Sequence, residues 1–185
     1  MEVGELIGKG SAGLVFKGLY KRLGVPVAIK SINIYEKEKR RQLLNDLKSL
    51  TALSKMREDG IISIPCDFLV NFHGGYLDDG TVKLVLELMD KGSLRDLIKK
   101  RLILSEGIVA LVAVQVLSGL SYLHNVARQA HLDIKPENIL INSQGLVKLS
   151  DFGISRDFED SHILMKTVMG TMTYMSPERI MVSGV

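Results

Sequence analysis

The chain has 185 residues, and 24 lysine and arginine residues against 21 aspartate and glutamate residues give it a formal net charge of +3. This length predicts a single domain with a sizeable core, and the mild positive charge does not favour nucleic acid or a membrane surface as a partner. The single cysteine, Cys66, excludes an internal disulfide and a multi-cysteine metal site, and it is typical of a reducing compartment.

The sequence shows neither a signal peptide nor a clear membrane span. The N-terminus, MEVGELIGKG, lacks the basic region followed by an apolar run that marks a signal peptide. The longest apolar stretch, 108–123, is interrupted by polar and small residues and is shorter than a membrane span. We therefore expect a buried helix there and no membrane segment.

Residues 1–35 are rich in β-forming residues and predict three strands. The hexapeptide GKGSAG at 8–13 joins the first two strands and follows the pattern G-x-G-x-x-G. Dinucleotide-binding folds share this pattern, but in them a helix begins at the third glycine. Here the β-rich segments LVFKGLY and VPVAIKSI follow, so the glycine-rich loop is predicted to cap a β-hairpin.

The middle of the chain alternates between helical and extended segments. Residues 36–53 predict a helix, because leucines recur at helical spacing. A strand is predicted over 68–72, a turn over 78–80 and an apolar strand over 81–88.

Two serines mark the starts of the next helices. Ser93 is the predicted N-cap of a short helix, with Asp96 supporting the cap, and Ser105 is the predicted N-cap of a long helix over 106–124.

The stretch 131–153, HLDIKPENILINSQGLVKLSDFG, gathers the groups with the clearest chemistry. Its two apolar runs flank a turn-forming tetrapeptide and predict a β-hairpin. Because the outer ends of a hairpin meet, Asn138 is expected beside Asp151, and an amide with a carboxylate favours Mg²⁺. Asp133 and Lys135 precede the hairpin, so a base and a cation reach the same point. A polar loop that merely caps a hairpin does not account for four such groups in one place.

HLDIKPEN followed by DFG resembles the catalytic loop H-R-D-x-K-x-x-N and the metal-binding motif D-F-G of protein kinases. By this resemblance Asp133 is the catalytic base and Lys135, typical of serine/threonine kinases, steadies the transferring phosphoryl group. The same motifs imply that Asn138 and Asp151 hold Mg²⁺. Leu132 stands where arginine is usual. That arginine normally pairs with the activation-loop phosphate, so we expect weak activation by phosphorylation, or activation through another basic residue.

The resemblance also gives roles to residues earlier in the chain. The glycine-rich loop is similar to the kinase flap over the ATP phosphates, and VAIK at 27–30 is similar to the strand whose lysine contacts those phosphates. The segment ELMDKGS at 87–93 is similar to the kinase hinge, with Leu86 before it as gatekeeper. The residues implied to bind ATP are Ile7, Gly8, Gly10, Gly13, Val15, Ala28, Lys30, Glu87, Met89 and Leu140. Lys30 is also implied in catalysis, and Asp46 takes the place of the helix glutamate that pairs with this lysine, one methylene shorter.

The segment GTMTYMSPE at 170–178 is similar to the end of a kinase activation segment, in the form most like MAP kinase kinases. Ser161 and Thr167 resemble the paired phosphorylation sites of the plant and protist members. The resemblance therefore implies a protein substrate, with a MAP kinase as the candidate, an upstream kinase acting on these two residues, and an intracellular, cytoplasmic location.

The resemblance spans the whole chain and implies an α+β, bilobal fold, with a β-rich N-lobe at 1–88 and a C-lobe at 89–185 whose later helices are missing. Three interpretations follow. The favoured one is an ATP- and Mg²⁺-dependent serine/threonine or dual-specificity kinase, because the catalytic and metal-binding residues are present. The others are a pseudokinase-like module that binds nucleotide or a partner, and a truncated, non-functional fragment.

Overall fold

The computed structural model describes residues 1–9, 13–35, 40, 43–44, 47, 66–151, 156–157 and 171–182. The predictions for Gly10, Asp46, Ser161 and Thr167 lie outside the described residues. So does most of the helix predicted over 36–53, although its four described residues, at 40, 43, 44 and 47, are helical.

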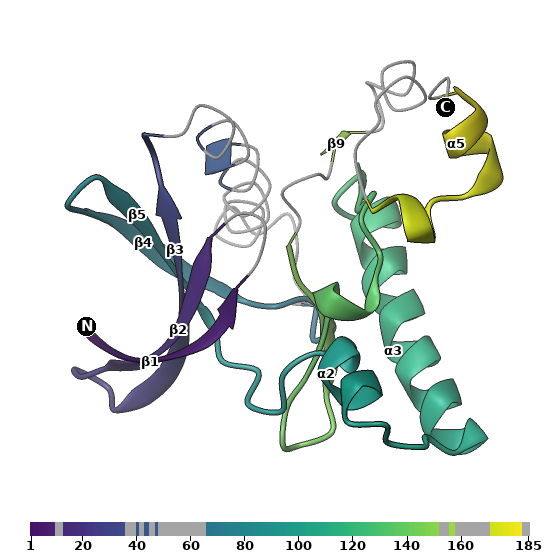
Figure 1. Cartoon of the computed structure of the whole chain (residues 1–185), viewed down its shortest axis with the longest axis horizontal. Coiled ribbons are helices and arrows are strands. Elements are labelled where there is room, and N and C mark those ends of the chain that lie inside the picture. Colours follow the sequence, from purple (N-terminus) through teal and green to yellow (C-terminus); the bar gives the residue numbers. More distant parts are fainter. Residues whose placement is uncertain are drawn as a thin grey trace.

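A five-stranded antiparallel sheet forms the N-terminal part of the molecule (Figure 1). Its strands are β1 (Glu2–Lys9), β2 (Leu14–Tyr20), β3 (Val25–Asn33), β4 (Phe72–Asp78) and β5 (Thr81–Glu87), in the spatial order β1-β2-β3-β5-β4. The three strands predicted over residues 1–35 are confirmed. The turn between β4 and β5 has positive φ at both central residues, Asp79 (43°) and Gly80 (66°), which suits a two-residue hairpin.

The central strand β3 is buried on both faces, and side-chain alternation separates its residues. Val27 and Ile29 pack with Val85 on one face of the sheet. Ile32 packs on the other face. Lys30 lies on the same face as Ile32 and is only 7% exposed, so its ammonium group points toward the rest of the molecule.

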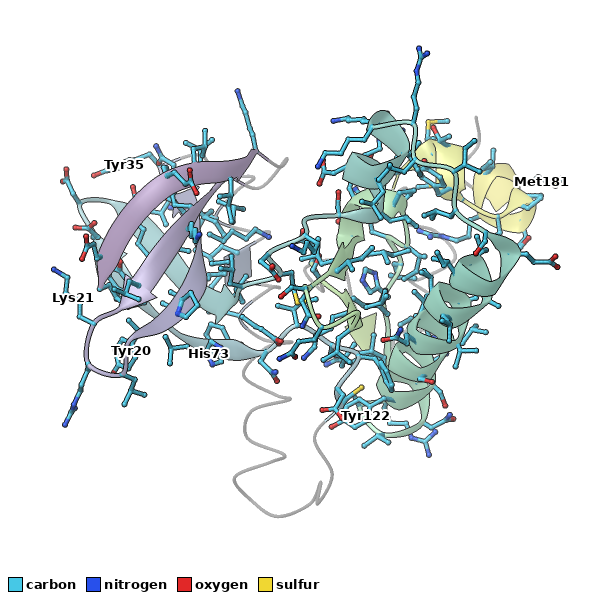
Figure 2. The ribbon with its side chains drawn as sticks, turned by 90° about the horizontal axis from the view of Figure 1, so that it is seen from below. Tyr20, Lys21, Tyr35, His73, Tyr122 and Met181 are labelled. Carbon is cyan, nitrogen blue, oxygen red and sulfur yellow. The ribbon has the colours of Figure 1, made fainter. Side chains whose placement is uncertain are left out.

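The C-terminal part is mostly helical and lies beside the sheet (Figure 1). Its helices are α2 (Leu94–Lys99), α3 (Glu106–Asn125) and α5 (Pro177–Val182), with 3₁₀ turns at Pro136–Asn138 and Met172–Tyr174. Its short strands are β6 (Gln129–Ala130), β7 (Ile139–Ile141), β8 (Val147–Leu149) and β9 (Arg156–Asp157). Figure 2 shows the side chains of both parts, with Tyr20 at the end of β2, Lys21 in the turn that follows it, and Met181 at the opposite end of the molecule.

The predicted helix caps are confirmed. The Ser93 hydroxyl accepts a hydrogen bond from the backbone N–H of Asp96, and the Asp96 carboxylate accepts one from the backbone N–H of Ser93, which completes a capping box. The Ser105 hydroxyl accepts one from the backbone N–H of Ile108 and caps α3.

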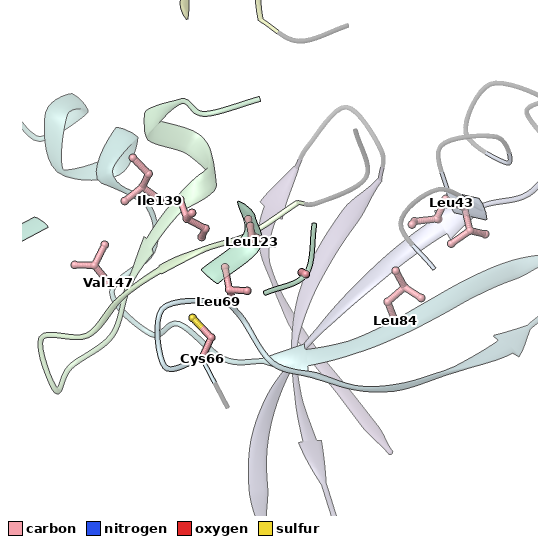
Figure 3. Packing of buried hydrophobic residues seen from close by; sticks show 10 residues of the cluster. Leu43, Cys66, Leu69, Leu84, Leu123, Ile139 and Val147 are labelled. Atoms are coloured by element: carbon pink, nitrogen blue, oxygen red, sulfur yellow. The ribbon is translucent and has the colours of Figure 1, made fainter. Parts of the chain in front are cut away.

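One apolar cluster joins the two parts (Figure 3). It contains residues of the sheet and the helix predicted after it, residues of the segment before β4, residues of α3, and residues of the β7–β8 hairpin. Its buried members are Ile32, Leu43, Cys66, Leu69, Leu84, Leu123, Ala127, Ile139, Val147 and Leu149. The α+β architecture with a β-rich N-terminal part is thereby confirmed, and the lobe boundary at residue 88 stays a prediction.

The strand predicted over 68–72 is wrong, because the strand in this region, β4, begins at Phe72 and ends at Asp78. Residues 68–70 instead run beside β8, where Leu69 forms an isolated bridge with Leu149. Glycines at 74 and 75 weaken the local strand pattern. Pairing with β5 overrides that weakness.

The prediction that the apolar helix would be buried is also wrong for the described structure. Only Gly119 and Leu123 of α3 are buried, whereas Leu111 is 65% exposed and Leu117 is 63% exposed. Among the described residues, α3 is the one helix long and apolar enough to cross a membrane by length and composition alone, a test that core helices of soluble proteins also pass. The absence of a membrane segment stays a prediction.

A close contact at Gly119 generates a stability prediction. A Cβ at this position would lie 3.0 Å from the carbonyl oxygen of Phe68, which already accepts a hydrogen bond from the backbone N–H of Leu149 at 2.9 Å. We expect Gly119→Ala to lower the free energy of unfolding by about 1 kcal/mol, because overpacking outweighs the gain in helix propensity.

The matched control is Gly107→Ala in the first turn of α3, where an added Cβ meets nothing within 4 Å. This variant is expected to keep or raise stability by up to about 1 kcal/mol. Urea unfolding of both variants checks the pair, and equal stabilisation by the two changes would contradict the contact.

Candidate functional site

The loop between β6 and β7 places Asp133, Lys135 and Asn138 in one hydrogen-bonded group. The Lys135 ammonium lies 2.6 Å from Asp133 Oδ2. The Asn138 side-chain amide donates to the backbone carbonyl of Asp133 at 2.8 Å and to Asp133 Oδ2 at 3.1 Å. Asp133 and Asn138 are both buried, so this group is fixed within the fold.

Thr171 completes this group, although none of the motifs described above assigns it a role. Its backbone N–H and its hydroxyl both donate to Asp133 Oδ1 at 3.0 Å. Its hydroxyl oxygen also accepts from the Lys135 ammonium at 2.9 Å. Thr171 lies 38 residues after Asp133, and no local pattern links them. Its position within the GTMTYM motif was the only available indication.

The predicted β-hairpin is confirmed, with Ile139 paired to Leu149 at its open end. The backbone N–H of Ser150 donates to the carbonyl of Asn138 at 2.9 Å. The residue before Asp151 is therefore tied to Asn138, as the hairpin geometry predicts.

Lys30 reaches Asp151 from the sheet, and its ammonium forms an ion pair with Asp151 Oδ1. The two residues are 121 positions apart in the sequence. Lys30, Asp151 and the hydrogen-bonded group around Asp133 thus form one charged site between the sheet and the helical part.

Two residues of the site have a left-handed backbone. Leu132 has φ of 64° and Asp151 has φ of 59°, a conformation that residues with a Cβ adopt at an energetic cost and that clusters at functional sites. The carbonyl of Leu132 accepts a hydrogen bond from the Arg179 guanidinium at 3.1 Å. The backbone before Asp133 is therefore held from α5.

Both carboxylates of the site have lowered pKa values. Burial alone would raise the pKa of Asp133, but hydrogen bonds from Lys135 and Thr171 outweigh it. For Asp151, removal from water likewise opposes ionisation, and the positive charge of Lys30 outweighs it and lowers the pKa. Both groups are therefore ionised at neutral pH.

The predicted nucleotide-binding residues are distributed over the sheet and the β7–β8 hairpin. Val15 pairs with Lys30 and Ala28 pairs with Leu86 across neighbouring strands, which places these four on one face. Gly8 pairs with Val15, while Ile7 is exposed on β1.

The segment predicted to be the hinge contacts the β7–β8 hairpin through Ser93. Met89 is buried, and Leu140 lies in β7, where it forms an isolated bridge with Ser93.

The last position of the glycine-rich loop requires glycine, because a Cβ at Gly13 would collide with the carbonyl oxygen of Ser31.

The donor set suits Mg²⁺ completed by phosphates. Among the described residues, no group of three or more histidine, cysteine, aspartate or glutamate side chains could hold a metal ion by itself. Mg²⁺, however, commonly takes one or two protein oxygens together with phosphates and waters. Asp151 offers a carboxylate. Because Nδ2 of Asn138 faces Asp133, its amide oxygen is the atom left for a cation.

Comparison with known proteins gives a family match over the whole chain. A model of the family described as "Protein kinase domain" matches residues 1–185. The chain is 40% identical over 183 residues to "Mitogen-activated protein kinase kinase 3" of Arabidopsis thaliana, covering 97% of this chain and 33% of that protein. It is 38% identical over 181 residues to "Mitogen-activated protein kinase kinase 1c" of Physcomitrium patens, covering 97% and 50%.

A third relative is "Dual specificity mitogen-activated protein kinase kinase 1" of Dictyostelium discoideum, at 36% identity over 183 residues, covering 97% and 26%. The chain thus spans between 26% and 50% of the length of these three relatives. The expected similarity to MAP kinase kinases is confirmed.

The buried His131 generates a pH prediction. Its Nε2 donates to the carbonyl of Ser150 at 2.9 Å, since its Nδ1 accepts from the backbone N–H of Asp133. Burial lowers the pKa of His131. Below about pH 6.5 the unfolded chain therefore takes up a proton that the folded chain does not. We expect the free energy of unfolding to fall by up to about 1.4 kcal/mol per pH unit between pH 6.5 and 5.

The variant His131→Gln is expected to be less stable at pH 7.5 but to lose less on acidification to pH 5. The lowered pKa values of Asp133 and Asp151 act in a lower window, below about pH 4. The exposed His124→Gln variant is the control for the loss of a histidine side chain. Thermal unfolding at both pH values checks this, and an unchanged slope in His131→Gln would contradict it.

Proposed function

This chain belongs to the protein kinase family, and we propose that it transfers the γ-phosphate of ATP to serine or threonine, with tyrosine as a further acceptor, in a Mg²⁺-dependent reaction. One observation carries the proposal. Asp133, bonded to Lys135 and Thr171, lies in the same site as the Lys30–Asp151 ion pair. A base, two cations and a metal-binding carboxylate are the groups that phosphoryl transfer to a hydroxyl requires.

The proposed roles follow from the contacts. Asp133 is ionised and accepts the proton of the attacking hydroxyl. The Lys135 ammonium, which lies 2.6 Å from Asp133 Oδ2, neutralises charge on the transferring phosphoryl group. Lys30 contacts the α- and β-phosphates. Bound Mg²⁺ would neutralise the phosphate oxygens and would be held by Asp151 and Asn138.

The adenine end of ATP is proposed to lie against the sheet and the hinge. Val15, Ala28 and Leu140 provide apolar contacts. The backbones of Glu87 and Met89 provide hydrogen bonds. Ile7, Gly8, Gly10 and Gly13 belong to the loop over the phosphates, and Asp46 is the proposed partner of Lys30 when ATP is bound.

The partners are proposed from the three relatives described above, all of which are named mitogen-activated protein kinase kinases. We propose a MAP kinase as the protein substrate and an upstream kinase that phosphorylates Ser161 and Thr167. An intracellular, cytoplasmic location fits this role and the single cysteine.

The proposed roles of Lys30 and Asp151 lead to a prediction about ATP binding. Lys30→Met is expected to weaken ATP binding by roughly tenfold or more, because it removes a charge-assisted contact to phosphate. Asp151→Asn is expected to remove the dependence of ATP affinity on Mg²⁺. Isothermal titration with and without Mg²⁺ measures both effects. The control is Lys21→Met, a lysine on the β2–β3 turn whose side chain is 66% exposed.

A wild-type protein that bound no ATP would contradict the proposed kinase activity, although the family membership would remain. Binding indifferent to Mg²⁺ would remove the metal roles of Asp151 and Asn138.

The proposed role of Asp133 leads to a prediction about turnover. Asp133→Asn is expected to lower kcat by roughly 10²–10⁴, the usual contribution of a general base, with little change in the dissociation constant of ATP. The control is Asp79→Asn in the β4–β5 turn, where asparagine also tolerates the positive φ of 43°. Phosphate transfer to a generic protein substrate is measured. Equal rates for wild type and Asp133→Asn would favour the alternative, a pseudokinase-like binding module.

A further inference from the structure

Lys148 is a buried lysine that the proposed chemistry does not use. It is the central residue of β8, and the residue as a whole is 4% exposed. An ammonium group removed from water is strongly unfavourable unless it is paired and hydrogen-bonded. Its partner is Glu87, the last residue of β5, whose two carboxylate oxygens each lie 2.9 Å from the Lys148 ammonium.

Glu87 is held a second time by Asn71. The Asn71 side-chain amide donates to Glu87 Oε2 at 2.8 Å, and the backbone N–H of Asn71 donates to the same oxygen at 3.2 Å. In return, the backbone N–H of Glu87 donates to the carbonyl of Asn71 at 2.9 Å. We call Asn71, Glu87 and Lys148 the hinge junction.

The hinge junction connects three segments that are remote in sequence. The segment before β4 pairs with β8, because Val70 donates to the carbonyl of Leu149 and Leu149 donates to the carbonyl of Phe68, both at 2.9 Å. The other end of the hinge is bonded to β7, where the backbone N–H groups of Lys91 and Ile141 donate to the carbonyls of Ile141 and Gly92. The hinge is therefore fixed to both strands of the β7–β8 hairpin.

The same hairpin carries the proposed metal ligands at its open end. Lys148 lies three positions before Asp151, and Glu87 lies two positions before Met89. The ion pair thus links the segment whose backbone is proposed to bind adenine to the strand that precedes the carboxylate proposed to bind the phosphate-bound metal.

We propose that Lys148 is a positioning residue for nucleotide binding, which acts by fixing the hinge backbone at Glu87 and Met89 relative to the hairpin. This inference rests on the proposed ATP-dependent function. A positioning role is favoured over stability alone, because a buried ion pair adds little net stability relative to apolar side chains, whereas the Lys148 ammonium joins β8 to the last residue of β5 through both carboxylate oxygens of Glu87.

The test separates the two ends of ATP in the intact protein. Adenosine probes the hinge, and tripolyphosphate with Mg²⁺ probes Lys30 and Asp151. Lys148→Met is expected to weaken adenosine binding by roughly tenfold, within the range of coupling between contacting residues, and to leave tripolyphosphate binding within about twofold. The control is Lys21→Met, which removes an exposed ion pair with Glu2 and should change neither affinity.

The double variant Glu87→Gln with Lys148→Met removes the buried charge of Lys148 and the partly buried charge of Glu87, and it keeps an oxygen at position 87 for Asn71. We expect it to regain thermal stability relative to Lys148→Met, because no buried charge is left unpaired, while its adenosine affinity stays low. Adenosine affinity that recovers together with the melting temperature would show a purely structural role and overturn the positioning proposal.

Equal weakening of adenosine and tripolyphosphate binding would overturn it as well, as would unchanged adenosine binding. A wild-type protein that binds neither probe would show that the proposed function itself fails. If the wild-type protein and the Lys148→Met variant both bound the two probes with equal affinity, the proposed function would be retained and only the positioning role would be rejected.

Discussion

The apolar cluster between the sheet and the helical part is the constraint on which the site depends. Lys30 and Asp151 are separated by 121 positions, and each is carried by an element that contributes to this cluster. Ile32 follows Lys30 on β3, and Leu149 precedes Asp151 on β8. Removing these apolar surfaces from water brings the two strands together, and the opposite charges then meet at the edge of the cluster.

The β7–β8 hairpin is too short to be stable by itself, since each strand has three residues. Its stability comes from its neighbours. The segment before β4 pairs with β8 and the hinge bonds to β7, while the Gln115 side chain of α3 accepts from the backbone N–H of Val147 at 2.9 Å. Asn138 and Asp151 are therefore positioned by tertiary contacts on three sides, which is the support that a precise site needs.

The charged groups described at the site occur in compensated pairs, so a bound nucleotide has to replace the existing partner of each charged group that it contacts. Asp133 is paired with Lys135, Asp151 with Lys30, and Glu87 with Lys148. Phosphates and Mg²⁺ would compete for Lys30 and Asp151 respectively, so the ion pair between them must be exchanged for new contacts. The Glu87–Lys148 pair involves no group proposed to contact phosphate and can persist throughout, which is why it suits a positioning role.

The sequence by itself determined the features that depend on near neighbours. Caps at Ser93 and Ser105, the turn at Asp79 and the β7–β8 hairpin follow from short-range hydrogen bonding and backbone sterics, which act within a few residues. The motifs around Asp133 and Asp151 also indicated the family. Only the tertiary structure decided the start of β4, the exposure of α3, the contact of Thr171 with Asp133 and the burial of Lys148. Each of these depends on which distant segments do or do not pack together, because strand pairing, burial and charge compensation are decided by which surfaces meet in space.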